Sequence, residues 1–120
     1  MTSRAISDEE VQAAKAAKME VVERMKQVLS GDTVVCLPTT ASPAPPTGER
    51  TSARNGIRQR NSSLTCIAGT TGGPQINLPL AQLDGLPVGL SLLGAPGSDE
   101  ALIGLAREVA AAMPGYSRVS

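Results

Sequence analysis

Four small polar residues recur at helical spacing in the middle of the chain. Arg54 to Gly69 is predicted to be a helix, and steps of three and four residues place these side chains on one of its sides. The stripe consists of Gln59, Ser62, Ser63 and Cys66. Such hydroxyl, amide and thiol groups can line a substrate pocket. The same pattern also fits an ordinary solvent-facing stripe, and the residues alone leave both interpretations open.

Nucleophilic chemistry in this chain has to operate without imidazole, because the sequence contains no histidine. Histidine is the commonest general base and the commonest metal ligand. Cys66 is the one candidate nucleophile of a small cysteine-dependent enzyme, but a thiol needs a neighbouring base or cation for activation. Cys36 stands in an apolar run and is predicted to pack in the core. We therefore assign no catalytic residue.

The remaining ligand motifs are weak. The glycine-rich segment Gly69–Gly73 lacks the Gly-Lys-Ser/Thr ending of a P-loop and precedes a predicted strand rather than a helix. The two cysteines form no CxxC pair, so neither a zinc site nor a disulfide framework is expected. We expect no metal and no organic cofactor.

Composition excludes several classes of partner. Lys and Arg number 11, as do Asp and Glu, and Tyr116 is the one aromatic residue, so a basic footprint and base-stacking platforms for nucleic acid are both missing. No apolar run is long enough for a membrane span, and the polar start at Met1–Gln12 does not resemble a secretory signal. We expect a protein of the reducing cytoplasm.

Helical signals occur at three places. Ser7 and Glu10 form a capping-box pattern before an amphipathic segment that is predicted to end near Ser30 and Gly31. The helix over Arg54–Gly69 has Ile57, Leu64, Ile67 and Ala68 on its apolar side. A last helix is predicted to be capped by Ser98 and ended by Pro114 and Gly115.

Strand signals lie between these helices. Asp32–Leu37 is predicted to be a strand buried on both faces, which Pro38 ends, and a proline-rich loop follows over about 38–54. Gln75–Leu80 and Pro87–Gly94 are predicted to form a hairpin, with a longer loop around the Asp84-Gly85 turn. The pattern predicts a single partial α/β domain over 1–120.

Three stretches of the sequence are similar to one known family. They are Leu37-Pro38-Thr39, the run Ala68-Gly69-Thr70-Thr71-Gly72-Gly73-Pro74-Gln75-Ile76-Asn77-Leu78-Pro79-Leu80, and the run Asp84-Gly85-Leu86-Pro87-Val88-Gly89-Leu90-Ser91-Leu92-Leu93-Gly94. In order and spacing they resemble the C-terminal part of the amidase signature family, over about Val11 to Ala112. The resemblance implies a piece of a mixed sheet flanked by helices, with strand edges that are open in isolation.

The resemblance also implies a chemistry. Family members hydrolyse carboxamide C–N bonds with two serines and a lysine and need no cofactor. Those catalytic residues lie upstream of the matched segment, and Thr70 and Thr71 do not replace the serines. The helix before the glycine-rich turn contributes to the substrate pocket in this family. Gln59, Ser62, Ser63 and Cys66 are therefore substrate-lining candidates, provided that the catalytic part is present.

Three functions follow as hypotheses. The first is a C-terminal fragment of an amidase-type hydrolase, inactive alone, that pairs with the upstream catalytic part. The second is a non-catalytic interaction module or remnant that pairs its open strand edge with another polypeptide. The third is a small enzyme that depends on Cys66, which predicts an alkylation-sensitive thiol.

Overall fold

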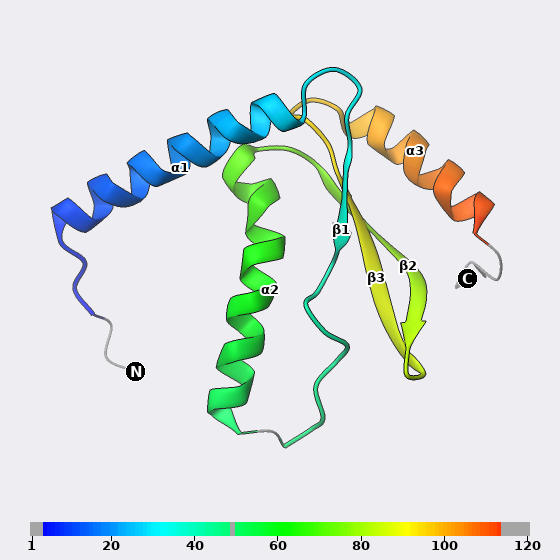
Figure 1. Ribbon diagram of the computed structural model, residues 1–120, viewed down its shortest axis with the longest axis horizontal. Coiled ribbons are helices and arrows are strands. Elements are labelled where there is room, and N and C mark those ends of the chain that lie inside the picture. The colour runs from blue at the N-terminus through cyan, green and yellow to red at the C-terminus, as the bar shows by residue number, and fades with distance from the viewer. Residues whose placement is uncertain (1–3, 49, 114–120) are drawn as a thin grey trace.

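Three helices and three strands make up the fold in the computed structural model, which describes residues 4–48 and 50–113. In chain order they are α1 (Asp8–Val28), β1 (Val35–Pro38), α2 (Thr51–Thr71), β2 (Gln75–Leu83), β3 (Leu86–Leu93) and α3 (Asp99–Ala112). The strands form one sheet with α1 and α3 extending in opposite directions from one end of it (Figure 1). This is the α/β arrangement that the sequence predicted.

The sheet has the order β1-β3-β2, and both pairings are antiparallel. Asp84 and Gly85 alone connect β2 to β3, with φ angles of 51° and 76°. Positive φ at both central residues is the requirement of a type I′ turn, which matches the twist of the flanking strands. The expectation of a longer hairpin loop was therefore wrong, because a tight turn satisfies the geometry with two residues.

One face of the sheet packs against α3. Leu78 and Leu92 share this face, and they form a core cluster with Leu102 and Ala106 of α3. Val34, Ile76, Leu80, Leu105 and Val109 pack around the cluster. Because side chains alternate along a strand, the residues between these leucines point to the opposite face. That face contains Leu37, Ser91 and Leu93, which are all buried.

The two long helices contribute little to this core. Helices α1 and α2 have 21 residues each and contain no buried residue. The capping box at Ser7 forms as predicted, with Glu10 N–H donating to Ser7 Oγ over 3.2 Å and Ser7 N–H donating to Glu10 Oε2 over 3.0 Å. Helix α2 begins at Thr51 and ends at Thr71, so it extends beyond the predicted bounds at both ends.

The strand β1 differs from its prediction. Its burial alternates along the four residues rather than being continuous, and Cys36 is exposed. The prediction that Cys36 belongs to the core was wrong, because β1 is an edge strand and α3 packs on β2 and β3. The apolar composition of the run gave no information on how many neighbours the strand would have.

The start of α3 also differs from its prediction. Ser98 occupies the N-cap position but makes no side-chain cap, because its hydroxyl donates to the carbonyl oxygen of Ala95 over 2.6 Å. Helix α3 ends at Ala112, and the predicted stop signals Pro114 and Gly115 lie outside the described residues.

The chain exposes more surface than a compact protein of its mass. Its accessible surface is 9145 Å², whereas a compact monomer of this mass exposes about 6,100 Å². The radius of gyration is 17.3 Å, against about 14 Å for a compact domain of this length. Helices α1 and α2 contain no buried residue, and α1 extends away from the sheet (Figure 1).

Candidate functional site

A polar cluster occupies the sheet face that α3 leaves uncovered. Ser91 of β3 lies directly opposite Asn77 of β2 and Leu37 of β1. Thr39 follows the end of β1, and its N–H donates to the carbonyl oxygen of Gly89 over 3.0 Å. This bond extends the β1–β3 ladder by one step and brings Thr39 beside Asn77 and Ser91. We call Thr39, Asn77 and Ser91 the polar triad.

The hydrogen bonds within the polar triad have defined donors and acceptors. Thr39 Oγ1 donates to Asn77 Oδ1 over 2.5 Å, and it lies 2.8 Å from Ser91 Oγ. A hydroxyl has a single proton to donate, so Ser91 must be the donor to Thr39. Ser91 is fully buried, at 0% exposure, so its hydroxyl depends on this partner for its hydrogen bond. The resulting chain runs from Ser91 through Thr39 to the carbonyl oxygen of Asn77.

A hollow of about 390 Å³ borders the polar triad. Thr39 and Asn77 line it on the sheet side, and Ile57 and Asn61 line it from α2. Its remaining wall consists of Thr40, Ser42, Pro43, Ala44, Pro45, Pro87, Val88 and Gly89. Every one of these lining residues is uncharged. The hollow can therefore orient a polar group by hydrogen bonds, but it brings no acid or base to that group.

The loop that closes the hollow is fixed to α2. The N–H of Ala41 donates to Asn61 Oδ1 over 2.9 Å. The sheet side is equally constrained, because a Cβ at Gly89 would collide with the amide oxygen of Asn77 and come within 2.8 Å of Thr39 Oγ1. Glycine at this position therefore allows the side chains of Asn77 and Thr39 to lie close to the backbone of β3.

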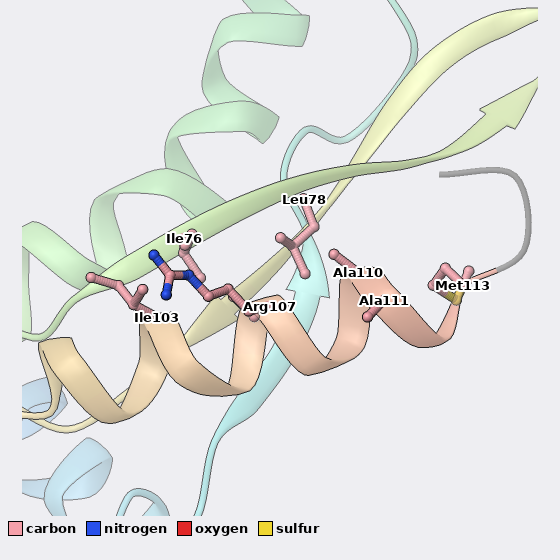
Figure 2. A pocket seen from close by; sticks show the side chains of 8 residues that line it. Ile76, Leu78, Ile103, Arg107, Ala110, Ala111 and Met113 are labelled. Carbon is pink, nitrogen blue, oxygen red and sulfur yellow. The ribbon is translucent and has the colours of Figure 1, made fainter. Parts of the chain in front are cut away.

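A second, larger groove of about 800 Å³ runs between β2 and α3. Figure 2 shows Ile76 and Leu78 of β2 facing Ile103, Ala110 and other residues of α3. Arg107 is the one charged residue of its lining. The groove continues the core outward and contains no hydroxyl, thiol or carboxylate, so we assign it no chemistry.

The residues predicted from the stripe lie elsewhere. Gln59, Ser62, Ser63 and Cys66 are all exposed on α2. Gln59 stands two residues from Ile57, or about 200° around the helix axis. The stripe thus points away from the hollow. Ser63 Oγ donates to the carbonyl oxygen of Arg60 over 2.6 Å, within the helix itself.

Sequence reasoning missed the polar triad as a site. Its members come from three strands or strand ends that are distant in the chain, and only the register brings them together. The available signal was a small polar residue between apolar neighbours at 77 and at 91, together with a glycine inside a predicted strand at 89.

Residues 4–48 and 50–113 contain neither a metal-binding cluster nor a membrane-spanning helix. Within these ranges no three His, Cys, Asp or Glu side chains gather in a way that could hold a metal ion. The helices found there are also too short or too polar to cross a bilayer.

Comparison with known proteins identifies the fold. The family model for amidases matches residues 1–103. The chain belongs to the amidase family. Among its curated relatives, Amidase 1 of Arabidopsis thaliana is 33% identical over 105 residues, which are 88% of this chain and 25% of that protein. The resemblance seen in the sequence motifs is thereby confirmed.

Other relatives of this amidase segment have different names. The pea protein named translocon at the outer membrane of chloroplasts 64 (Pisum sativum) is 30% identical over 98 residues, 82% of this chain and 16% of that protein. The mitochondrial outer envelope protein 64 of Arabidopsis thaliana is 26% identical over 121 residues, 100% of this chain and 20% of that protein. A cytoplasmic location for the chain stays a prediction.

Solved structures agree on the architecture of the amidase segment. A crystal structure of an amidase superimposes with a TM-score of 0.74 and 26% identity over 90% of this chain and 26% of that one. The 6-aminohexanoate cyclic dimer hydrolase gives a TM-score of 0.78 at 22% identity, over 94% of this chain and 26% of that one, which shows the shared fold. The chain thus spans about a quarter of the length of these proteins.

Proposed function

We propose that the chain is the C-terminal, substrate-facing portion of an amidase-type hydrolase that acts on carboxamide C–N bonds. The observation that carries this proposal is the uncovered state of α1 and α2, which bury no residue in a chain spanning a quarter of its amidase relatives. Apolar residues exposed on α1, including Met19 at 73%, offer a surface for further polypeptide.

The proposal assigns no catalytic role within this chain. The two serines and the lysine that the family uses would come from the upstream catalytic part. In that assembly Gln59, Ser62, Ser63 and Cys66 would form part of the substrate lining. Their exposure on the side of α2 that faces away from the hollow supports this role, because that side is open to a further polypeptide.

Ammonia release from carboxamides tests the proposal. The purified chain is assayed alone and after co-expression with the polypeptide encoded directly upstream. We expect no hydrolysis by the chain alone and hydrolysis by the co-expressed pair. Replacing Ser62 by Leu in the pair should change KM more than kcat, and Ser52→Leu, on the first turn of α2, is the control. Hydrolysis by the chain alone, or inactivity of a stable pair, would contradict the proposal.

The names of three relatives favour a second candidate, a non-catalytic interaction module. These relatives are named as a chloroplast translocon component and as outer envelope proteins. In this case the chain would use the same uncovered helices to bind another protein, without hydrolysis. A stable complex that releases no ammonia from any carboxamide would favour this candidate over the first.

A further inference from the structure

We propose that the open edge of β2 binds an extended acidic peptide, which adds a fourth strand to the sheet and places one carboxylate against Arg107 of α3. The occupant is a segment of a partner protein in which an Asp or Glu stands two residues from a large apolar residue on either side. The inference does not rest on the proposed function, because no residue of α1 or α2 lines the groove between β2 and α3.

One edge of β2 has no strand beside it in the part of the chain that the structure describes. The sheet order is β1-β3-β2, so β2 pairs with β3 alone. The N–H of Gly94 donates to the carbonyl oxygen of Pro74 over 3.0 Å, and the register of the pair continues from there. Because bonded and non-bonded pairs alternate between antiparallel strands, the backbone groups of Gln75 and Asn77 point to the open edge. An added strand can pair with these two residues.

The open edge is short. Pro79 has no N–H to donate, and the register between β2 and β3 shifts between Leu78 and Ala81. Prolines and bulges of this kind block the addition of further strands in natural sheets. The segment Gln75–Leu78 is therefore the part of β2 that can accept a strand, and its partner is a short peptide segment.

The groove lies on the outer side of β2. Its lining comes from β2 and from α3 with its C-cap Met113, and it includes no residue of β1 or β3. Figure 2 shows Ile76 and Leu78 facing α3 from β2. Alternate side chains of a strand added to β2 point to the same face as these two residues, so they enter the groove. A volume of about 800 Å³ is sufficient for several such side chains.

The spacing of the α3 residues matches the spacing of side chains along a strand. Ile103, Arg107 and Ala111 follow one another at four-residue steps, and all three line the groove. Four residues of helix rise about 6 Å, and every second side chain of a strand lies about 6.7 Å further along. Three alternate side chains of the peptide can therefore face these three residues in turn. Apolar side chains suit Ile103 and the space beside Ala111.

The middle position favours a carboxylate. Arg107 is exposed and is the one charged residue of the lining. Helical ion pairs form between residues three or four positions apart, and those neighbours of Arg107 are all uncharged: Ile103, Gly104, Ala110 and Ala111. The ion pairs of the described residues join other side chains. Because a guanidinium can donate two parallel hydrogen bonds to a carboxylate, Asp or Glu fits this position better than a neutral residue.

A blocked peptide of seven residues tests the inference. Its sequence is TLTETLT, with an acetylated N-terminus and an amidated C-terminus, so that two leucines flank the Glu at alternate positions. The full chain, labelled with ¹⁵N, is titrated with this peptide and followed by NMR. We expect saturable shifts of the backbone signals of Gln75–Leu78 and of the groove-lining residues of α3. Replacing the Glu of the peptide by Gln should weaken binding about two- to fivefold, the effect of one exposed ion pair.

Arg107 variants separate the ion pair from the rest of the contact. In Arg107→Ala the Glu and Gln peptides should bind equally, because the guanidinium that distinguishes them is absent. Arg107→Glu should prefer a peptide with Lys in place of Glu. Arg58→Ala, on the exposed surface of α2, removes the same side chain outside the groove and should retain the preference for Glu.

N-methyl groups on the peptide test the addition of a strand. Antiparallel pairing continues the pattern of the sheet. In that arrangement the two threonines next to the Glu exchange backbone hydrogen bonds with Gln75 and Asn77, whereas the N–H of the Glu points away from β2. Methylation of both threonine nitrogens should lower the affinity at least about tenfold. Methylation of the Glu nitrogen is the matched control and should change the affinity little.

Four outcomes would overturn the inference. They are unmoved signals of Gln75–Leu78, equal binding of the Glu and Gln peptides to the wild type, and equal effects of the two methylations. The fourth is self-association through the same edge that the peptide does not displace, because a second copy would then be the occupant. A spectrum without dispersed amide signals would overturn the inference as well, because the edge would not exist in the chain alone.

Discussion

The helices of this molecule differ in burial although all three are amphipathic: α3 is packed against the sheet, whereas α1 and α2 are not. Helix α3, of 14 residues, buries Leu102 and Ala106 against β2 and β3. Helices α1 and α2, of 21 residues each, bury none and leave Val11, Met19, Val21 and Val28 exposed on α1. An amphipathic pattern therefore shows that a helix has an apolar face, but not that this chain covers it.

The difference divides the molecule into a covered half, which has its own core, and an uncovered half, which has none. The covered half, consisting of β2, β3 and α3, carries the core cluster. The uncovered half contains local signals, such as the capping box at Ser7 and the left-handed glycine at the end of α2, and its two helices contact each other. Mutations should accordingly have large effects on the covered half and small ones on the uncovered half.

The largest effect is expected from Leu102→Ala, in the centre of the covered half. Leu102 is 3% exposed and belongs to the core cluster. Removing its buried methyl groups should lower the free energy of unfolding by about 2–5 kcal/mol. Chemical denaturation followed by circular dichroism measures the change. Its neighbour Ile103 is 47% exposed, so Ile103→Ala should cost less than about 1 kcal/mol. Equal costs would show that burial does not determine the effect of a substitution within α3.

Gly72→Ala should have the next largest effect, at the junction of the two halves. Gly72 ends α2 at φ 75° and donates its N–H to the carbonyl oxygen of Ala68 over 2.8 Å. A Cβ in this left-handed conformation costs about 1–2 kcal/mol. Gly69→Ala, inside the same helix and with open space around it, should instead stabilise the chain by about 0.5–1 kcal/mol. Thermal unfolding of both variants provides the comparison, and shifts of the same sign would refute it.

Ser7→Ala should affect the uncovered half alone. The capping box satisfies backbone N–H groups at the start of α1, and its loss should cost about 1 kcal/mol of helix stability. Hydrogen exchange should speed up in the first turns of α1 and remain unchanged in β2 and β3. Ser7→Asp keeps an acceptor at the cap and should restore protection. Faster exchange throughout the sheet would show that α1 is coupled to the core.

Met19→Glu should have the smallest effect on the isolated chain. The side chain is 73% exposed, so the free energy of unfolding should change by less than about 0.5 kcal/mol. The same change should reduce co-purification with the upstream polypeptide, because it places a charge on the surface proposed for that contact. Gln27→Glu, also exposed on α1, introduces the same side chain with the same change of one charge and is the control. If Met19→Glu co-purifies with the upstream polypeptide as well as the wild type does, α1 does not form the proposed contact.

Local signals predicted most elements of the fold. The capping box at Ser7 and the Asp84-Gly85 turn depend on a few neighbouring residues, and both formed as the sequence indicated. The burial of Cys36 was predicted wrongly, because the number of neighbours of a strand is a property of the whole sheet. Ser98 shows a subtler failure, since its hydroxyl bonds backward to Ala95 instead of capping α3.

The candidate site was harder to predict from the sequence than the helices and strands. The stripe of Gln59, Ser62, Ser63 and Cys66 followed from helical spacing, and its substrate-lining role stays a prediction. Thr39, Asn77 and Ser91 share no local pattern, and they meet because β3 lies between β1 and β2. Long-range register, rather than residue type, makes them a site.

The central position of β3 also sets the order in which the sheet can assemble. Strands β2 and β3 are joined by two residues, and such hairpins form within about 1–10 μs. Strand β1 must close a far longer loop, which includes α2, before it pairs with β3, and this closure has a larger entropic cost. We expect β1 to dock last and detach first. The hydrogen bonds of Thr39 to Gly89, Asn77 and Ser91 then hold the end of β1 on the sheet. Orientation of the Asn77 amide would therefore report that folding is complete.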